Sequence, residues 1–139
     1  MDPELVKTAM PEKPHCPFCE PENPAVIIEH GTVFAIPDTS PVTPDHMLII
    51  PKRHCRDYFE MTPKERCDAH ELINTLKTMI LEKDPWVKGF NIGVNCGETA
   101  GQTIFHSHIH LIPRRENDTP FPRGGVRGVI PGRMNYPHP

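Results

Sequence analysis

The chain has 139 residues, 18 of them proline, with 37% hydrophobic residues and a formal net charge of −3. This length fits one domain with its own core, and the slightly acidic balance argues against a nucleic acid as the main partner. No apolar run resembles a signal peptide or a membrane span, so we expect a cytoplasmic protein with no membrane partner. The prolines cluster near both ends, which predicts an N-terminal arm over 1–24, a domain over 25–115 and a C-terminal arm over 116–139.

The first part of the domain favours strands. Ala25–Glu29 and Thr32–Ile36 are short runs of β-forming residues on either side of His30-Gly31, which is a hairpin signal. Met47–Ile50 is an apolar run that stops at Pro51, as is typical of a buried strand. We therefore expect three strands before the first helix.

One amphipathic helix follows. Thr62 suits the N-cap, Pro63 the first helical position, and Glu65 completes a capping box. Apolar residues then recur at helical spacing from Ala69 onward, and Asp84-Pro85 ends the helix. This helix should cover one face of the sheet.

Two more strands are expected after the helix, at Phe90–Asn95 and Thr103–Ile112, joined by a loop with two glycines. Two consecutive strands joined by a short loop pair as an antiparallel hairpin. The order of elements therefore predicts an α+β fold, an antiparallel sheet with one main helix on one face.

The last predicted strand carries three alternating histidines, His106, His108 and His110. Side chains alternate between the faces of a strand, so the three imidazoles share one face at spacings of about 6.6–7 Å. Apolar residues occupy the other face and should pack on the helix: Phe105, Ile109 and Leu111. Three imidazoles on one face are costly to bury without partners, which favours a functional cluster. The spacing does not decide between a nucleophile and zinc ligands.

Residues Gln102 to Ile112 resemble the signature of the histidine-triad (HIT) nucleotide hydrolases and transferases, H-x-H-x-H followed by two apolar residues. The resemblance continues in three upstream segments: Ile36-Pro37-Asp38, Thr43 to His54, and Asn91 to Asn95. It implies a five-stranded antiparallel sheet and a homodimer that joins two such sheets into one.

The resemblance also implies the chemistry. His108 attacks the α-phosphorus of a purine nucleoside 5′-phosphate derivative and forms a nucleotidyl-histidine intermediate, without a metal in the reaction. The other catalytic histidines, which shape and hydrogen-bond the site, are His110, His46 and His106. The nucleotide-binding residues are Gln102, Thr103 and Asn95 for the phosphate, Asp38 for the ribose and Ile36 for the base.

Simpler explanations exist for single residues. Asp38 and Asn95 both stand where turn residues are common, and His46 by itself is a loop histidine. Two other functions also remain open, a nucleotide-binding regulatory module with negligible turnover and a zinc hydrolase that uses the three histidines as ligands. The joint placement at family spacing favours the enzyme.

Cys16 and Cys19 form a C-x-x-C pair followed by a proline-rich stretch, which disfavours a redox helix. A structural zinc needs two further ligands. The resemblance to zinc-bearing HIT proteins and galactose-1-phosphate uridylyltransferases implies His54 and His106, with His15 as a spare candidate.

The C-terminal arm carries Arg123 and Arg127, which either contact the distal phosphates of a long substrate or serve in packing. Dinucleoside polyphosphates and nucleoside phosphoramidates or acyl adenylates are the competing substrate classes. The arginines favour the first class slightly.

Overall fold

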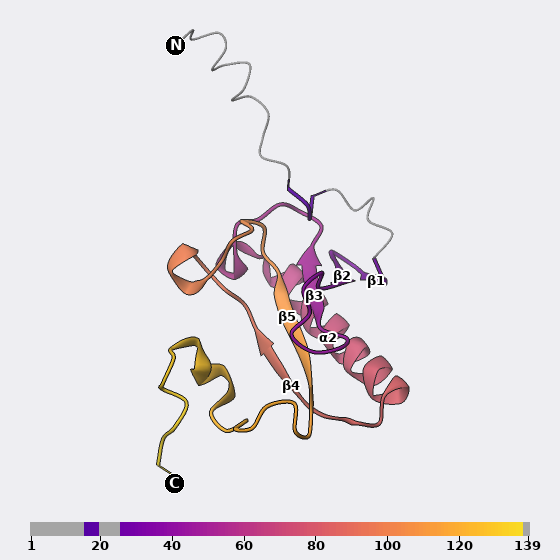
Figure 1. Ribbon diagram of the computed structural model, residues 1–139. Helices are drawn as coiled ribbons and strands as arrows, with labels where there is room; N and C mark the ends of the chain where they lie inside the picture. Colours follow the sequence, from indigo (N-terminus) through magenta and orange to yellow (C-terminus); the bar gives the residue numbers. More distant parts are fainter. Residues whose placement is uncertain (1–15, 20–25, 138–139) are drawn as a thin grey trace, which may run out of the picture.

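The computed structural model describes residues 16–19 and 26–137, which form one five-stranded antiparallel sheet with a long helix on one face (Figure 1). The strand order is β1-β2-β3-β5-β4, so β4 lies at an edge. The strands are β1 (Ile28–His30), β2 (Val33–Pro37), β3 (Met47–Pro51), β4 (Val87–Gly93) and β5 (Ile109–Arg115). This confirms the predicted α+β fold. Most of the predicted N-terminal arm, including His15, lies outside the described residues.

Helix α2 (Pro63–Lys83) begins and ends where the sequence predicted. The Thr62 hydroxyl accepts from the Glu65 amide at 3.0 Å, and the Glu65 carboxylate accepts from the Thr62 amide at 2.8 Å. This capping box satisfies two backbone amides that the helix itself leaves without partners. Asp84 closes the other end, where its amide donates to the Ile80 carbonyl.

The two faces of the sheet bury different sets of residues because the side chains of β2 and β3 alternate. On one face α2 packs against a core that includes Val33, Ala35, Met47, Ile49, Leu72 and Leu76. The opposite face carries a smaller apolar cluster: Phe18, Phe34, Ile36, Leu48 and Ile50. His110 of β5 lies opposite Leu48 of β3 in the ladder, which places the histidine on this second face.

The last two strands lie at different positions from those predicted. β5 begins only at Ile109, because residues 104–106 bend and the Ser107 amide donates to the Cys55 carbonyl at 2.7 Å instead of joining the ladder. Ile109 and Leu111 are buried as expected, but Phe105 is 41% exposed because it precedes the strand. β4 also begins three residues earlier than expected, at Val87, which is buried in the core.

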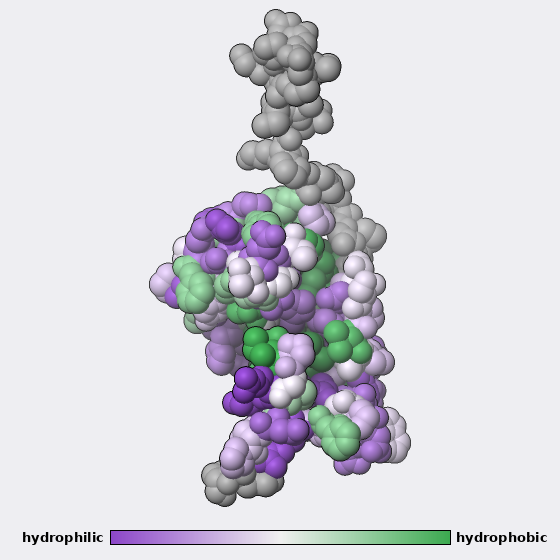
Figure 2. Space-filling model, turned by 60° about the vertical axis from the view of Figure 1, so that its left-hand side comes forward, coloured by the Kyte–Doolittle hydropathy of each residue, from purple (hydrophilic) through white to green (hydrophobic). Residues whose placement is uncertain are grey.

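The C-terminal arm continues from β5 into a short helix, η3 (Gly125–Val129), which contacts β4. Figure 2 turns this side of the molecule forward and shows hydrophobic residues in a band across the middle of the face. Exposed apolar side chains in β4 and the arm include Ile92, Val126, Val129 and Ile130. Within the described residues, no helix is both long and apolar enough to cross a bilayer.

Candidate active site and metal centre

Imidazole rings line the face of the sheet opposite α2 in two groups, and the Phe18 ring contacts His106 of one group and His108 of the other. His108 and His110 have ring centroids 5.3 Å apart, and His110 and His46 5.1 Å apart. At the other end His106 lies 4.9 Å from His54. The bend before β5 places His106 in the group with His54, although only His110 belongs to the regular strand.

His108, the middle histidine, has one ring nitrogen fixed by the backbone. Its Nδ1–H donates to the His106 carbonyl at 2.9 Å, which leaves the Nε2 lone pair available. The ring is buried, 9% exposed, and the edge of Phe18 contacts it with centroids 5.1 Å apart. A neutral imidazole with one nitrogen held by an acceptor is a competent nucleophile at neutral pH.

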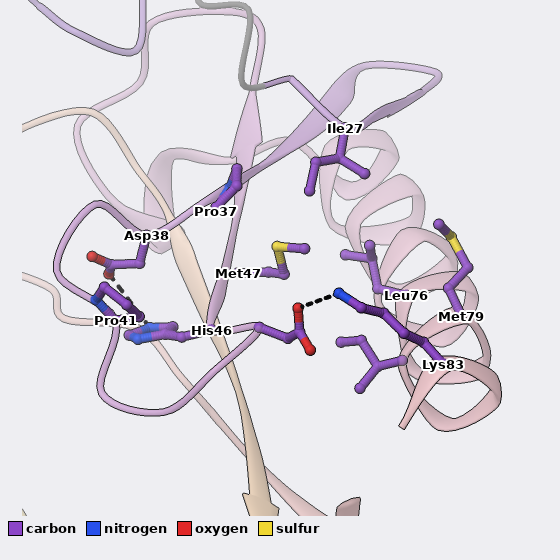
Figure 3. Close-up of a pocket in the computed structure, with 11 residues that line it drawn as sticks. Ile27, Pro37, Asp38, Pro41, His46, Met47, Leu76, Met79 and Lys83 are labelled. Carbon is purple, nitrogen blue, oxygen red and sulfur yellow. Dashed lines mark hydrogen bonds and ion pairs between the residues drawn. The ribbon is translucent and has the colours of Figure 1, made fainter. Parts of the chain in front are cut away.

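His46 and His110 form a hydrogen-bonded pair whose proton positions follow from their partners. The Val42 amide donates to His46 Nδ1 at 3.1 Å, so the proton of the neutral ring is on Nε2. His46 Nε2–H then donates to His110 Nδ1 at 2.9 Å, which leaves a proton on His110 Nε2. Asp38 lies beside the pair, 3.4 Å from His46 Nε2 (Figure 3).

Burial keeps this pair neutral. It lowers the pKa of His46, against a smaller opposing effect of the Asp38 charge. Burial also lowers the pKa of His110, and the neighbouring His108 and His46 lower it further. Both rings are therefore neutral at pH 7, as the hydrogen-bond pattern requires.

Gln102 is almost fully buried and organises the loop before the histidines. Its side-chain oxygen accepts from the Gly97 amide at 2.8 Å, and its side-chain nitrogen donates to the carbonyls of Arg56 and Ile104 at 2.6 and 3.1 Å. Gly97 and Gly101 have φ angles of 94° and 95°, a region that favours glycine. In this conformation the Gln102 amide has both protons engaged by the backbone.

The other expected nucleotide contacts occupy different environments. Thr103 is exposed at the end of the loop, and Asn95 is half-buried close to Gly101. Ile36 is 5% exposed within the second apolar cluster. Asp38 lies at the end of β2, where one oxygen accepts from the Ser40 amide at 2.8 Å and the other faces the His46–His110 pair.

Cys16, Cys19, His54 and His106 bring one ligand atom each to a common point, a grouping we call the hook site. His106 Nδ1 lies 3.5 Å from Cys16 Sγ and 3.4 Å from Cys19 Sγ. A tetrahedral zinc with bonds of about 2.3 Å to sulfur and 2.05 Å to nitrogen separates such ligands by about 3.5 Å. His106 Nε2–H donates to the Pro51 carbonyl at 2.7 Å, so Nδ1 carries the lone pair that a metal needs. The residues therefore fit a zinc ion.

The three triad histidines do not converge on one metal. Within the described residues, His106 belongs to the hook site, His110 groups with His46 and Asp38, and His108 belongs to no metal-ligand group. In the second group His46 Nδ1 accepts from the backbone, so its Nε2 carries a proton and has no lone pair for a metal. This arrangement disfavours the zinc-hydrolase alternative.

Two sets of ring contacts, one at the candidate site and one in the C-terminal arm, were not predicted from the sequence. Phe18 contacts both His106 and His108, so the hook places an aromatic ring against the central histidine. The guanidinium groups of Arg123 and Arg127 both lie over the Tyr136 ring, 4.9 and 4.8 Å from its centroid. The position of Phe18 between two cysteines was a visible signal for its contacts. No local pattern in the sequence indicates the arginine contacts with Tyr136.

Comparison with known proteins identifies the domain. Residues 20–117 match the family described as HIT domain. Adenylylsulfatase HINT3 of Arabidopsis thaliana is 38% identical over 110 residues, which cover 74% of this chain and 54% of that protein. An asymmetrical bis(5′-nucleosyl)-tetraphosphatase of Schizosaccharomyces pombe is 34% identical over 84 residues, covering 60% of this chain and 46% of the enzyme. The chain thus spans about half the length of these two relatives.

A solved structure also matches the fold. The zinc-bound histidine-triad protein of Mycobacterium smegmatis is 32% identical, with a TM-score of 0.67, covering 75% of this chain and 76% of that one. Zinc therefore occurs in a protein of the same fold and comparable sequence.

Proposed function

Because the chain belongs to the HIT domain family, we propose that it is a nucleotidyl hydrolase or transferase that cleaves at the α-phosphorus of a purine nucleoside 5′-phosphate derivative. The observation that carries the proposal is the state of His108. Its Nδ1–H is fixed on a backbone carbonyl, so Nε2 is the nitrogen that carries the lone pair of the neutral ring. A regulatory binding module has no need of such a nucleophile.

In the first step His108 Nε2 attacks the α-phosphorus, and the bond from phosphorus to the leaving group breaks. The product is a nucleotidyl-histidine, and the departing group takes up a proton or leaves as an anion. The imidazolium that forms keeps its Nδ1–H on the His106 carbonyl, which stabilises the developing positive charge. Water then attacks phosphorus, the bond from phosphorus to His108 Nε2 breaks, and the attacking water gives up a proton to solvent, which releases the nucleoside monophosphate and restores neutral His108.

The remaining residues position the phosphate, which is the main requirement of such transfers. His110 presents Nε2–H because His46 donates to its other nitrogen, so it is a donor for a phosphate or leaving-group oxygen. Thr103 adds an exposed hydroxyl. Gln102 reaches the phosphate only after releasing a backbone carbonyl; otherwise it acts by holding the loop. Asp38 and Ile36 are proposed to contact ribose and base.

A zinc ion at the hook site would have a structural role. Cys16, Cys19, His54 and His106 would hold it, and it would fix the N-terminal segment against the sheet. Metal analysis of chelator-free protein should find about one zinc per chain if the site has the usual four ligands. A zinc content below a tenth of that value, with no loss of zinc in Cys16→Ser, would exclude the site.

We also propose a homodimer formed through β4. This strand is at the edge of the sheet, and exposed apolar side chains such as Ile92 accompany it. A second copy pairing there would extend the sheet and cover apolar surface. Light scattering coupled to gel filtration should give twice the 15.8 kDa chain mass. The mass of a single chain at micromolar concentration would contradict the dimer.

The decisive experiment measures AMP release from diadenosine tetraphosphate, adenosine 5′-phosphoramidate and adenylyl sulfate. Wild type, His108→Asn and the control His70→Asn are compared, because His70 is an exposed histidine on α2. We expect the His108 substitution to lower kcat by on the order of a thousandfold or more and the His70 substitution to have no effect. AMP release by the wild type should also persist in the presence of a chelator that leaves the fold intact.

Each result has a clear meaning. The substrate with the highest kcat/KM names the leaving-group class. Release by His108→Asn at the wild-type rate refutes the nucleophile. If none of the three substrates is cleaved while AMP still binds, the regulatory nucleotide-binding module replaces the enzyme as the conclusion.

A further inference from the structure

The loop from Asp38 to His46 carries two residues of the candidate site, one at each end, and it turns through a strained residue. Asp45, immediately before His46, has a φ angle of 68°. Asp tolerates this left-handed conformation better than most residues, but it still costs energy that surrounding contacts must offset. The position of the His46 ring therefore depends on what holds Asp45.

Side-chain packing does not hold the loop on the α2 side. A cavity of about 400 Å³ separates it from the helix, with Met47, Leu76 and Ile80 among its apolar lining. Figure 3 shows Asp38, Pro41 and His46 at one end of this cavity and Leu76 and Met79 at the other. Polar contacts across the gap therefore hold the loop on this side, in addition to the bond from the Asp38 amide to the His46 carbonyl at 2.9 Å and the bond from the Thr43 hydroxyl to the Pro113 carbonyl at 2.7 Å.

Two cations make those contacts. Lys83, in the last turn of α2, pairs with Asp45 at 3.0 Å, and both residues line the cavity. Arg115, the last residue of β5, donates to the Pro44 carbonyl at 3.1 Å and lies 3.7 Å from the other Asp45 oxygen. The Arg115 side chain is only 16% exposed and is itself anchored on Asp84 at 2.8 Å.

We propose that Arg115 is a positioning residue for the catalytic site, which acts through Pro44 and Asp45 to hold His46. The Val42 amide of this loop donates to His46 Nδ1, and this contact places the proton on His46 Nε2 for His110. Arg115 thus fixes which nitrogen of His110 faces the substrate as a donor. The expected effect of Arg115 on kcat rests on the proposed nucleotidyl transfer, whereas its expected effect on the His46 tautomer does not.

The neighbouring Arg114 provides a matched control. It stands on the same strand and carries the same charge, but it binds Asp118 at 2.8 Å and Asn91 at 2.6 Å and makes no contact with the loop. Arg115→Ala should lower kcat at least tenfold and change KM less than twofold, whereas Arg114→Ala changes neither by more than twofold. Arg115→Lys, which retains the charge but not the forked geometry, should restore part of kcat.

A second readout is independent of turnover. Long-range ¹H–¹⁵N spectra of the histidine rings should show His46 as the Nε2–H tautomer in wild type and Arg114→Ala, and as a mixture in Arg115→Ala. If Arg115→Ala does not fold, Asp45→Asn replaces it, because Asn tolerates the same φ while losing the ionic contacts. An unchanged His46 tautomer in the tested variant overturns the proposal. Absence of activity in wild type refutes only the proposed function, and the tautomer still decides the role of Arg115.

Discussion

Phe18 links the hook site to His108, the proposed nucleophile, and its removal should weaken metal binding. The ring is 6% exposed, packs with Ile36 and Leu48, and contacts the rings of His106 and His108 edge-on. Burial of a phenylalanine side chain contributes about 1.5–3 kcal/mol, and an edge-to-face ring contact adds about 0.5–1.5 kcal/mol. The packing of Phe18 holds Cys16 and Cys19 against the sheet and so favours the four-ligand arrangement that a metal requires.

Phe18→Ala should therefore cost the hook site about 2–4.5 kcal/mol, which corresponds to about 30- to 2,000-fold weaker zinc affinity. Competition with a chromogenic chelator measures this directly. Phe59→Ala is the control, because that ring is 75% exposed on η1 (Tyr58–Glu60). Zinc affinity within threefold of wild type in Phe18→Ala would show that the hook docks without help from this ring, and the reasoning would fail.

Three further outcomes are expected. Thr62→Ala removes the capping box of α2 and should lower the free energy of unfolding by about 1 kcal/mol in urea titrations, whereas an unchanged midpoint would contradict the cap. Asp68→Asn should lower the urea midpoint, because the buried carboxylate accepts from the Thr32 amide and hydroxyl at 2.9 and 2.8 Å. The free energy of unfolding should fall as pH drops below about 6.5, because the lowered pKa values of His46 and His110 mean that the unfolded chain binds more protons there. At equal metal content His46→Gln should reduce that slope, and an identical slope would rule out His46 as a contributor.

Short sequence patterns predicted the elements that depend on contacts between residues close together in the chain. The capping box at Thr62 and Glu65 involves contacts three residues apart, so the start of α2 was visible in the sequence. The apolar run Met47–Ile50, which stops at Pro51, likewise indicated the buried strand β3. The ends of β4 and β5 were not predictable in this way, because they depend on contacts between distant segments. The bond from Ser107 to Cys55 is one such contact, and it delays the start of β5.

The same distinction between local and long-range contacts applies to the candidate site. The H-x-H-x-H segment identifies the histidines, but the partners of two of the three rings come from elsewhere in the chain. His106 takes the Pro51 carbonyl, His108 takes a carbonyl of its own segment, and His110 takes His46. Sequence spacing alone therefore could not distinguish a ligand, a nucleophile and a proton donor.

The division of the three histidines explains how one segment can serve both a metal and a nucleophile. A metal bound by His106 Nδ1 leaves the His106 backbone carbonyl free, and that carbonyl accepts the Nδ1–H of His108. The hook site and the Pro51 carbonyl hold the His106 ring in place. They therefore also hold the His106 backbone carbonyl, which sets the tautomer of His108. The hook site is linked to the proposed nucleophile through the backbone and Phe18, so a metal bound there would be coupled to the proposed reaction although the two share no ligand.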